Sequence, residues 1–191
     1  MSQSLCKIYI HLIFHIKTTS ALIRREDLPR VHQYIGQLVN ITGCSVMRVG
    51  GIEDHVHVLF LLNKNVDLAY VVEEIKRNSS RWIKTIDNHY KSFAWQGGYA
   101  AFSVSQSQVD RTLLYIDNQV EHHKSMSFKD EYLLFLQNYH LDFDAQHIFT
   151  DREIIDKPNR TSMRVYCTLL FVFSRCECVL LFIVMEFDVG K

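Results

Sequence analysis

Two histidines separated by a single residue are the clearest chemical signal in the chain. His55 and His57 lie within residues 51–60, where alternation of side chains predicts a strand that places both imidazoles on one face. Two imidazoles roughly 7 Å apart along a strand can aim ring nitrogens at one metal ion, but such a site needs a further ligand. The alternative is that the pair forms only the polar face of a strand.

A second set of chemical groups lies on a helix predicted at residues 105–123. Tyr115 and Gln119 are four residues apart, so they are neighbours on the helix surface. The glutamine amide oxygen is a hard ligand that would complete a His-His-Gln site suited to Mg²⁺ or Mn²⁺. A phenol, whose ordinary pKa is about 10, becomes a usable nucleophile when a metal stabilises the phenolate. Because a tyrosine near a glutamine is otherwise commonplace, this interpretation depends on the histidine pair.

Hydrophobic periodicity predicts the elements that must position these groups. The predicted strands and helices alternate as β-α-β-β-α-β-α-α, at residues 7–16, 27–42, 45–50, 56–62, 66–90, 99–104, 105–123 and 128–138. Asp27 and Ser127 are expected N-caps, Gly43 a helix stop, and Ser105 with Gln108 a capping box. This order predicts an α+β fold, an antiparallel or mixed sheet with helices packed on one face.

Composition restricts the class of protein. A chain of 191 residues with 48% hydrophobic residues suits one domain with a substantial core. Because 21 basic and 21 acidic residues give no net charge, nucleic-acid binding would have to depend on local charge placement. The five cysteines lack zinc-finger spacing and are interpreted as reduced thiols, and no signal peptide is evident, so a cytoplasmic location is expected.

The end of the chain departs from this pattern. Residues 165–187 are mostly apolar, but Arg175 and Glu177 lie in their middle, where a membrane helix tolerates charge poorly. No membrane contact is therefore expected, and the alternatives are two short strands or a peripheral extension. The sequence predicts a domain at residues 1–154 and an atypical apolar C-terminal extension at residues 155–191.

Several motifs occur in an order that resembles one known family. They are the H-V-H pair, W-Q-G-G-Y-A-A-F-S-V-S at 95–105, Y-I-D-N-Q at 115–119, the opening strand at 9–17, and E-Y-L-L-F-L at 131–136. Over roughly residues 5–150 the chain resembles the single-tyrosine HUH transposases of small insertion sequences, the IS-two-hundred-like transposases. It departs from them at residues 17–20, where Lys-Thr-Thr-Ser replaces the usual basic Lys-Tyr-Arg.

The resemblance implies a fold, a site and a reaction. It implies a ferredoxin-like or RRM-like sheet with His55 and His57 on a central strand, binding Mg²⁺ or Mn²⁺ together with Gln119. Tyr115 would be the nucleophile that cleaves and rejoins single-stranded DNA beside a hairpin through a 5′-phosphotyrosine link, for transposition of a small insertion sequence. Two ends must be cut and each chain offers one candidate tyrosine, so a homodimer with shared active sites is expected.

Local charge fits a DNA partner despite the neutral total. Arg77, Arg81, Lys84 and Lys91 recur at helical spacing on the predicted long helix, and Arg111 lies one turn before Tyr115. The alternative is that the long helix merely presents a solvated face.

Other residues near these motifs are expected to have structural roles. His122 and His123 are predicted at the surface. Trp95, Tyr99 and Phe102 are predicted mainly in the core, with stacking on bases as the alternative.

Three other functions remain open from the sequence. A domesticated relative that nicks or binds hairpin DNA would carry the same residues. A catalytically silent RRM-like nucleic-acid-binding module would not need His55, His57, Tyr115 and Gln119 together. A zinc hydrolase built on the histidine pair would need another histidine or an acidic ligand, for which Glu53 and Asp54 are less well placed than Gln119.

Overall fold

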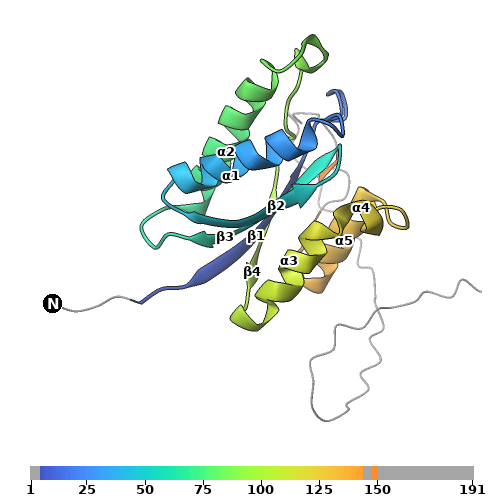
Figure 1. The fold of residues 1–191 in the computed structure, drawn as a ribbon. Coiled ribbons are helices and arrows are strands. Elements are labelled where there is room, and N and C mark those ends of the chain that lie inside the picture. Colours follow the sequence, from blue (N-terminus) through green and yellow to red (C-terminus); the bar gives the residue numbers. More distant parts are fainter. Residues whose placement is uncertain (1–4, 144–147, 150–191) are drawn as a thin grey trace, which may run out of the picture. The chain divides into compact units, whose positions relative to one another are not determined.

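The computed structural model describes residues 5–143 and 148–149, and a four-stranded sheet forms their centre (Figure 1). The strands follow the order β2-β3-β1-β4 with every neighbouring pair antiparallel, and they are β1 (Ile8–His15), β2 (Ser45–Gly51), β3 (His55–Leu62) and β4 (Ala100–Val104). The predicted α+β class and antiparallel sheet are confirmed. The predicted extension at residues 155–191 lies outside the described residues.

Helices lie against both faces of this sheet. They are α1 (Leu28–Ile41), α2 (Leu68–Ile83), α3 (Val109–Asp117), α4 (Gln119–His122) and α5 (Phe128–Asn138). Helices α1 and α2 cover the face that carries Leu12 and Phe14, while α3 and α5 pack on the face that carries Ile13 and Leu59. Packing had been expected on one face only. The second layer forms because the histidine-bearing face also carries large apolar side chains, which are stabilised by burial.

Some of the helix caps and stops predicted from the sequence are present in the structure, and others are not. Ser127 caps α5, since its hydroxyl accepts a hydrogen bond from the backbone N–H of Asp130, and Gly43 follows α1 with φ of 82°. Asp27 precedes α1, but its carboxylate accepts from the Tyr90 hydroxyl and not from the helix backbone. The capping box of Ser105 and Gln108 does not form, because residues 106–108 make a short 3₁₀ turn.

The long helix ends earlier than the periodicity predicts. Helix α2 stops at Ile83, and Lys84 is its C-cap residue. The chain then forms a 3₁₀ turn at Asn88–Tyr90, capped by the Asp87 carboxylate. The apolar spacing continues past the helix because Tyr90 enters the same core from this turn. Lys91 consequently does not extend the basic face of α2.

Two of the five cysteines lie among the described residues. Cys6 is exposed and Cys44 is buried, and both are free thiols. Across residues 5–143 and 148–149, no helix is both long enough and apolar enough to cross a bilayer.

A glycine allows α3 to approach the sheet at the level of the histidine pair. Gly50 lies opposite His57 across the β2–β3 ladder, and a Cβ atom there would lie 2.7 Å from both the Cγ2 and the carbonyl oxygen of Ile116 in α3. No side chain fits at that distance. Residue 50 therefore fixes how closely the tyrosine-bearing helix can pack over the site.

We expect Gly50→Ala to lower the free energy of unfolding by about 1–3 kcal/mol, because the new methyl group must displace the backbone of α3. Gly36→Ala is the matched control, since its Cβ would meet side chains at an ordinary 3.7 Å and alanine favours a helix. Urea unfolding curves of both variants check the expectation. Equal stability of Gly50→Ala and the wild type would contradict it.

Candidate active site

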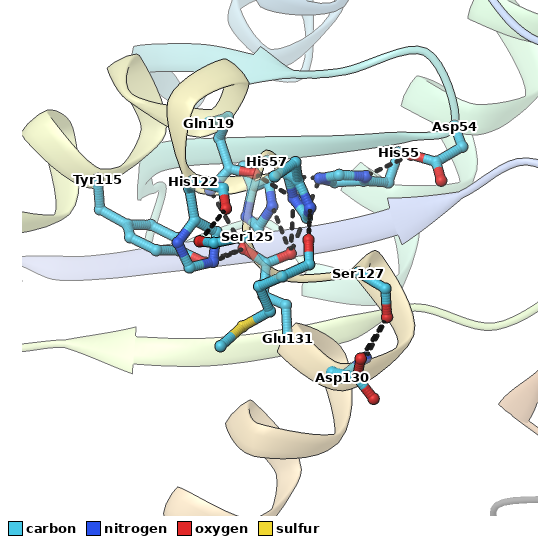
Figure 2. Close-up of polar contacts among 12 residues, drawn as sticks. Asp54, His55, His57, Tyr115, Gln119, His122, Ser125, Ser127, Asp130 and Glu131 are labelled. Carbon is cyan, nitrogen blue, oxygen red and sulfur yellow. Dashed lines mark hydrogen bonds and ion pairs between the residues drawn. The ribbon is translucent and has the colours of Figure 1, made fainter. Parts of the chain in front are cut away.

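Four elements bring the predicted chemical groups together on one face of the sheet. His55 and His57 project from β3, and His11 projects beside them from β1. Tyr115 reaches the same point from α3 and Gln119 from α4, after the helix breaks at Asn118 (Figure 2). The four residues singled out from the sequence thus converge within a single chain.

Neighbouring groups orient both histidines of the pair. The Nδ1–H of His55 donates to the Asp54 carboxylate at 2.6 Å, and Nδ1 of His57 is hydrogen-bonded to Nε2 of His11 at 2.9 Å. Both Nε2 atoms are therefore turned toward the helices. Carboxylate and imidazole partners of this kind fix ring orientation in metal-binding histidines.

The central residue of the site, Glu131 on α5, was missed in the sequence analysis. Its side chain is only 2% exposed, and its Oε2 lies 3.5 Å from Nε2 of His57 and 3.8 Å from Nε2 of His55. Its Oε1 accepts a hydrogen bond from the Tyr115 hydroxyl and another from the Gln119 amide at 3.2 Å. His55, His57 and Glu131 form a buried group whose ligand atoms lie within 4.8 Å of one another and could hold a metal ion.

A signal for Glu131 was present in the sequence. Phe128, Tyr132 and Leu136 recur at helical spacing along α5, and Glu131 falls inside that apolar stripe. A carboxylate on the buried face of a helix is expensive unless it is paired, which marks it as a candidate for a polar site.

The Gln119 oxygen faces two imidazoles. It lies 3.1 Å from Nε2 of His55 and 3.1 Å from Nε2 of His123. In His123 the Nδ1–H donates to the Met126 carbonyl at 2.8 Å, which turns Nε2 toward the Gln119 oxygen. His123 was expected at the surface, but its side chain is 5% exposed; His122 retains 28%. The surface assignment is therefore wrong for His123, because α4 turns that ring inward against Gln119.

This arrangement of acceptor atoms fits a cation. In the described part of the chain, the buried side-chain atoms without a hydrogen-bond partner include Nε2 of His57, Nε2 of His122 and Oε2 of Glu131, all within this cluster. Lone pairs that face one another repel unless a positive charge lies between them. A divalent ion bound by Nε2 of His55 and His57 and by Oε2 of Glu131 would give the unpartnered atoms of His57 and Glu131 a partner, and the Gln119 oxygen is a further candidate ligand.

Burial sets the protonation states in the site. It lowers the pKa of His57 to about 4, which leaves the imidazole neutral and able to bind a metal at pH 7. Burial also raises the pKa of the Tyr115 phenol, and the adjacent Glu131 carboxylate raises it further. Burial acts to raise the pKa of Glu131, but contacts with His57 and Tyr115 outweigh it and hold that pKa below its ordinary value.

These shifts predict a pH-dependent stability for the metal-free protein. The pKa of His57 is about 4 in the folded chain and about 6.5 when unfolded, so the unfolded state binds more protons between these values. We expect stability to be complete above about pH 6.5 and to fall as the pH drops toward 4, with His57 contributing on the order of 3 kcal/mol. Urea unfolding at several pH values, with His57→Gln as the comparison, checks this. An equally steep fall in the variant would contradict it.

The basic residues predicted to bind DNA do not form one equivalent set. Arg77 is paired with Glu73 at 2.8 Å and with Glu74. Arg81 and Lys84 are exposed and have no acidic partner among the described residues. Arg111 is exposed on α3, the helix that carries Tyr115. The charge of Arg77 is thus locally neutralised, while the other three remain available.

Two transposases are among the solved structures to which this chain is similar. One is a candidate transposase from Deinococcus radiodurans, with 20% identity, a TM-score of 0.48, and coverage of 62% of this chain and 98% of its own. Another is a REP-associated tyrosine transposase bound to a REP hairpin, with 15% identity, a TM-score of 0.47, and coverage of 64% of this chain and 74% of its own. No curated protein matches the sequence. The family model described as "Transposase IS200 like" matches residues 4–119, and the chain belongs to that family.

Proposed function

We propose that this transposase-family protein cleaves and rejoins single-stranded DNA with Tyr115 as nucleophile and a divalent metal bound by the histidine pair. The observation that carries the proposal is the convergence of the Tyr115 hydroxyl, the Glu131 carboxylate and two correctly oriented imidazoles in one buried cluster. A protein that only bound DNA would gain nothing from burying these groups together, because buried polar clusters are costly to maintain.

Each residue has a defined part in the proposed reaction. The Tyr115 oxygen attacks a DNA phosphorus atom in line, the bond from phosphorus to the 3′ oxygen breaks, and a 5′-phosphotyrosine bond forms. Glu131 already accepts a hydrogen bond from the phenol, so it is placed to take the proton, and the departing 3′ oxygen gains one to become a hydroxyl. Reversal by a 3′-hydroxyl rejoins the strands, because the covalent link conserves the phosphodiester energy.

His55 and His57 would hold the metal, with Gln119 and Glu131 as the candidate oxygen ligands. When bound there, Mg²⁺ or Mn²⁺ supplies positive charge that polarises the phosphate and favours the phenolate. Glu131 is also the acidic ligand that the zinc-hydrolase alternative required. Its hydrogen bond to a tyrosine that lies 5.7 Å, ring to ring, from His57 favours attack by Tyr115 over attack by water.

The proposal extends to partners and location. The substrate is single-stranded DNA presented beside a hairpin, and the catalytic domain comprises residues 1–154, with the apolar extension at 155–191 outside it. Two cleavages per element and one nucleophile per chain call for a homodimer. Such a protein would act in the cytoplasm, where the predicted free thiols remain reduced.

A covalent-adduct assay tests the proposal. The full chain is mixed with a labelled pool of single-stranded hairpin DNAs and Mg²⁺ or Mn²⁺, and the products are separated under denaturing conditions. We expect a labelled protein band that requires the metal and disappears with EDTA. DNA binding without any adduct would overturn the proposal in favour of a silent binding module.

A further inference from the structure

A groove separates α2 from the segment that leads into β4. It measures about 530 Å³, and its walls include Lys76 and Arg81 from α2 and Gln96 and Tyr99 from the facing segment. None of the residues assigned to the proposed chemistry lines this groove.

One wall of the groove is fixed by a half-buried lysine. The Nζ of Lys76 donates to the carbonyl oxygens of Gln96, Gly97 and Gly98 at 2.6, 2.8 and 2.8 Å. All three of its protons are thereby engaged, so Lys76 holds the shape of this turn and is not itself free to bind a ligand. The backbone N–H of Gln96 also donates to the His15 carbonyl at 2.8 Å, which ties the turn to the end of β1.

The groove carries an available positive charge and an available aromatic ring. Arg81 has no acidic partner within the described region, whereas Arg77, one turn earlier, is neutralised by two glutamates. Tyr99 is 40% exposed, while the neighbouring Trp95 is buried and donates its indole N–H to Ser79. An exposed aromatic ring and an available arginine that line one groove are the combination that binds unpaired bases and their phosphates.

This groove shares wall residues with a second cavity that lies beside the candidate active site. Gln96 and Tyr99 also line a second cavity of about 420 Å³, whose walls include His15 and Tyr132. His15 pairs with His55 across the β1–β3 ladder, and Tyr132 follows Glu131 on α5. A strand that passes His15, the β1 neighbour of His55, can therefore cross the turn at Tyr99 before it reaches Arg81.

We infer that this path binds the single-stranded DNA that flanks the cleavage position, with Tyr99 stacking on a base and Arg81 contacting a phosphate. The inference rests on the proposed function and names its strand-binding subsite. Single-stranded DNA is the occupant because base faces are available for stacking only when the bases are unpaired.

Fluorescence anisotropy of the full chain in EDTA tests the inference without cleavage. The probes are an oligothymidylate of about 12 nucleotides, which fits typical single-strand site sizes, and a blunt hairpin duplex. We expect Tyr99→Ala to weaken binding of the oligothymidylate roughly 5- to 100-fold and Tyr99→Phe to retain it, because stacking needs the ring and not the hydroxyl. Arg81→Gln should weaken binding similarly and reduce the salt slope by about one. Neither variant should change hairpin binding.

Two exposed residues outside the groove provide matched controls. Tyr70→Ala removes an exposed ring, and Lys64→Gln removes an exposed charge from the opposite end of the sheet; both should bind the oligothymidylate like the wild type. Unchanged binding by Tyr99→Ala and Arg81→Gln, or equal loss for both probes, would overturn the inference. If the wild type still forms the metal-dependent adduct, either of these outcomes would overturn the inference about the groove and leave the proposed function supported. An absent adduct with intact Tyr99-dependent binding would overturn only the proposed function.

Discussion

Replacing Tyr115 with phenylalanine is expected to reduce strand cleavage and covalent attachment to background, a loss on the order of 10⁴-fold or more. The substitution removes the one oxygen in the phenol that could bond to phosphorus, so no slower route through the same residue remains. The ring and its packing against His57 and Phe135 are retained. Stability should change by about 1 kcal/mol, because Glu131 loses one hydrogen bond but keeps the donation from Gln119.

The adduct assay with Tyr115→Phe checks this expectation, and Tyr132→Phe is its matched control. Tyr132 follows Glu131 in α5 and its side chain is also buried. Because its hydroxyl has no part in the proposed reaction, Tyr132→Phe should still form the adduct. An adduct in Tyr115→Phe would show that another of the nine tyrosines, or another nucleophile, carries the DNA.

A mixture of two variants shows whether each active site of a dimer uses Tyr115 of its own chain or the tyrosine of the other subunit. The family resemblance implies shared sites, whereas here Tyr115 contacts Glu131 of its own chain. With this single-chain geometry, mixed dimers of Tyr115→Phe and His57→Ala should form no adduct, since neither subunit has a complete site. Restored adduct formation would require a tyrosine supplied by the other subunit.

Removing one imidazole of the pair is expected to eliminate metal binding. In His57→Ala the cluster loses one of its two nitrogen ligands, together with the contact between that ring and Glu131. Mn²⁺ affinity should therefore fall by more than the 10- to 100-fold that is typical when a residue hydrogen-bonded to a metal ligand is removed. The wild type at a metal concentration of 100 times Kd should gain about 2.7 kcal/mol in stability, and the variant should gain almost nothing.

Isothermal titration with Mn²⁺ and thermal melts with and without the ion provide the measurement. Each protein is compared with itself, so a change in the stability of the metal-free variant does not affect the outcome. His89→Ala is the control, since His89 is exposed and hydrogen-bonds to the Leu22 carbonyl away from the cluster. Unchanged Mn²⁺ binding in His57→Ala would contradict the metal assignment.

The sequence was most informative where geometry is local. Strand alternation alone places His55 and His57 on one face, and helical spacing brings Tyr115 close to Gln119 despite the break at Asn118. Glu131 could not be placed in the same way. It joins the site through the path of the chain from α4 to α5, which no periodic pattern specifies.

Side-chain pairing was the other property that sequence patterns could not supply. The basic face predicted on the long helix treated Arg77 and Arg81 as equivalent, but among the described residues glutamates pair with Arg77 and not with Arg81. The helix limit at Ile83 was also missed, because Tyr90 continues the apolar spacing from a separate turn. Hydrophobic periodicity predicts which residues lie in the core, but it does not show whether all of them belong to the same helix.

Complete burial of the histidine pair has a kinetic consequence. The side chains of His55 and His57 have no exposed surface, and α4 and α5 enclose the Glu131 carboxylate over them. A DNA phosphate cannot touch these atoms until that helical layer moves aside, and such opening is a unimolecular event. At saturating DNA, the rate of adduct formation should therefore level off at the opening rate, and amide protons of α5 should exchange with solvent more quickly once DNA is bound.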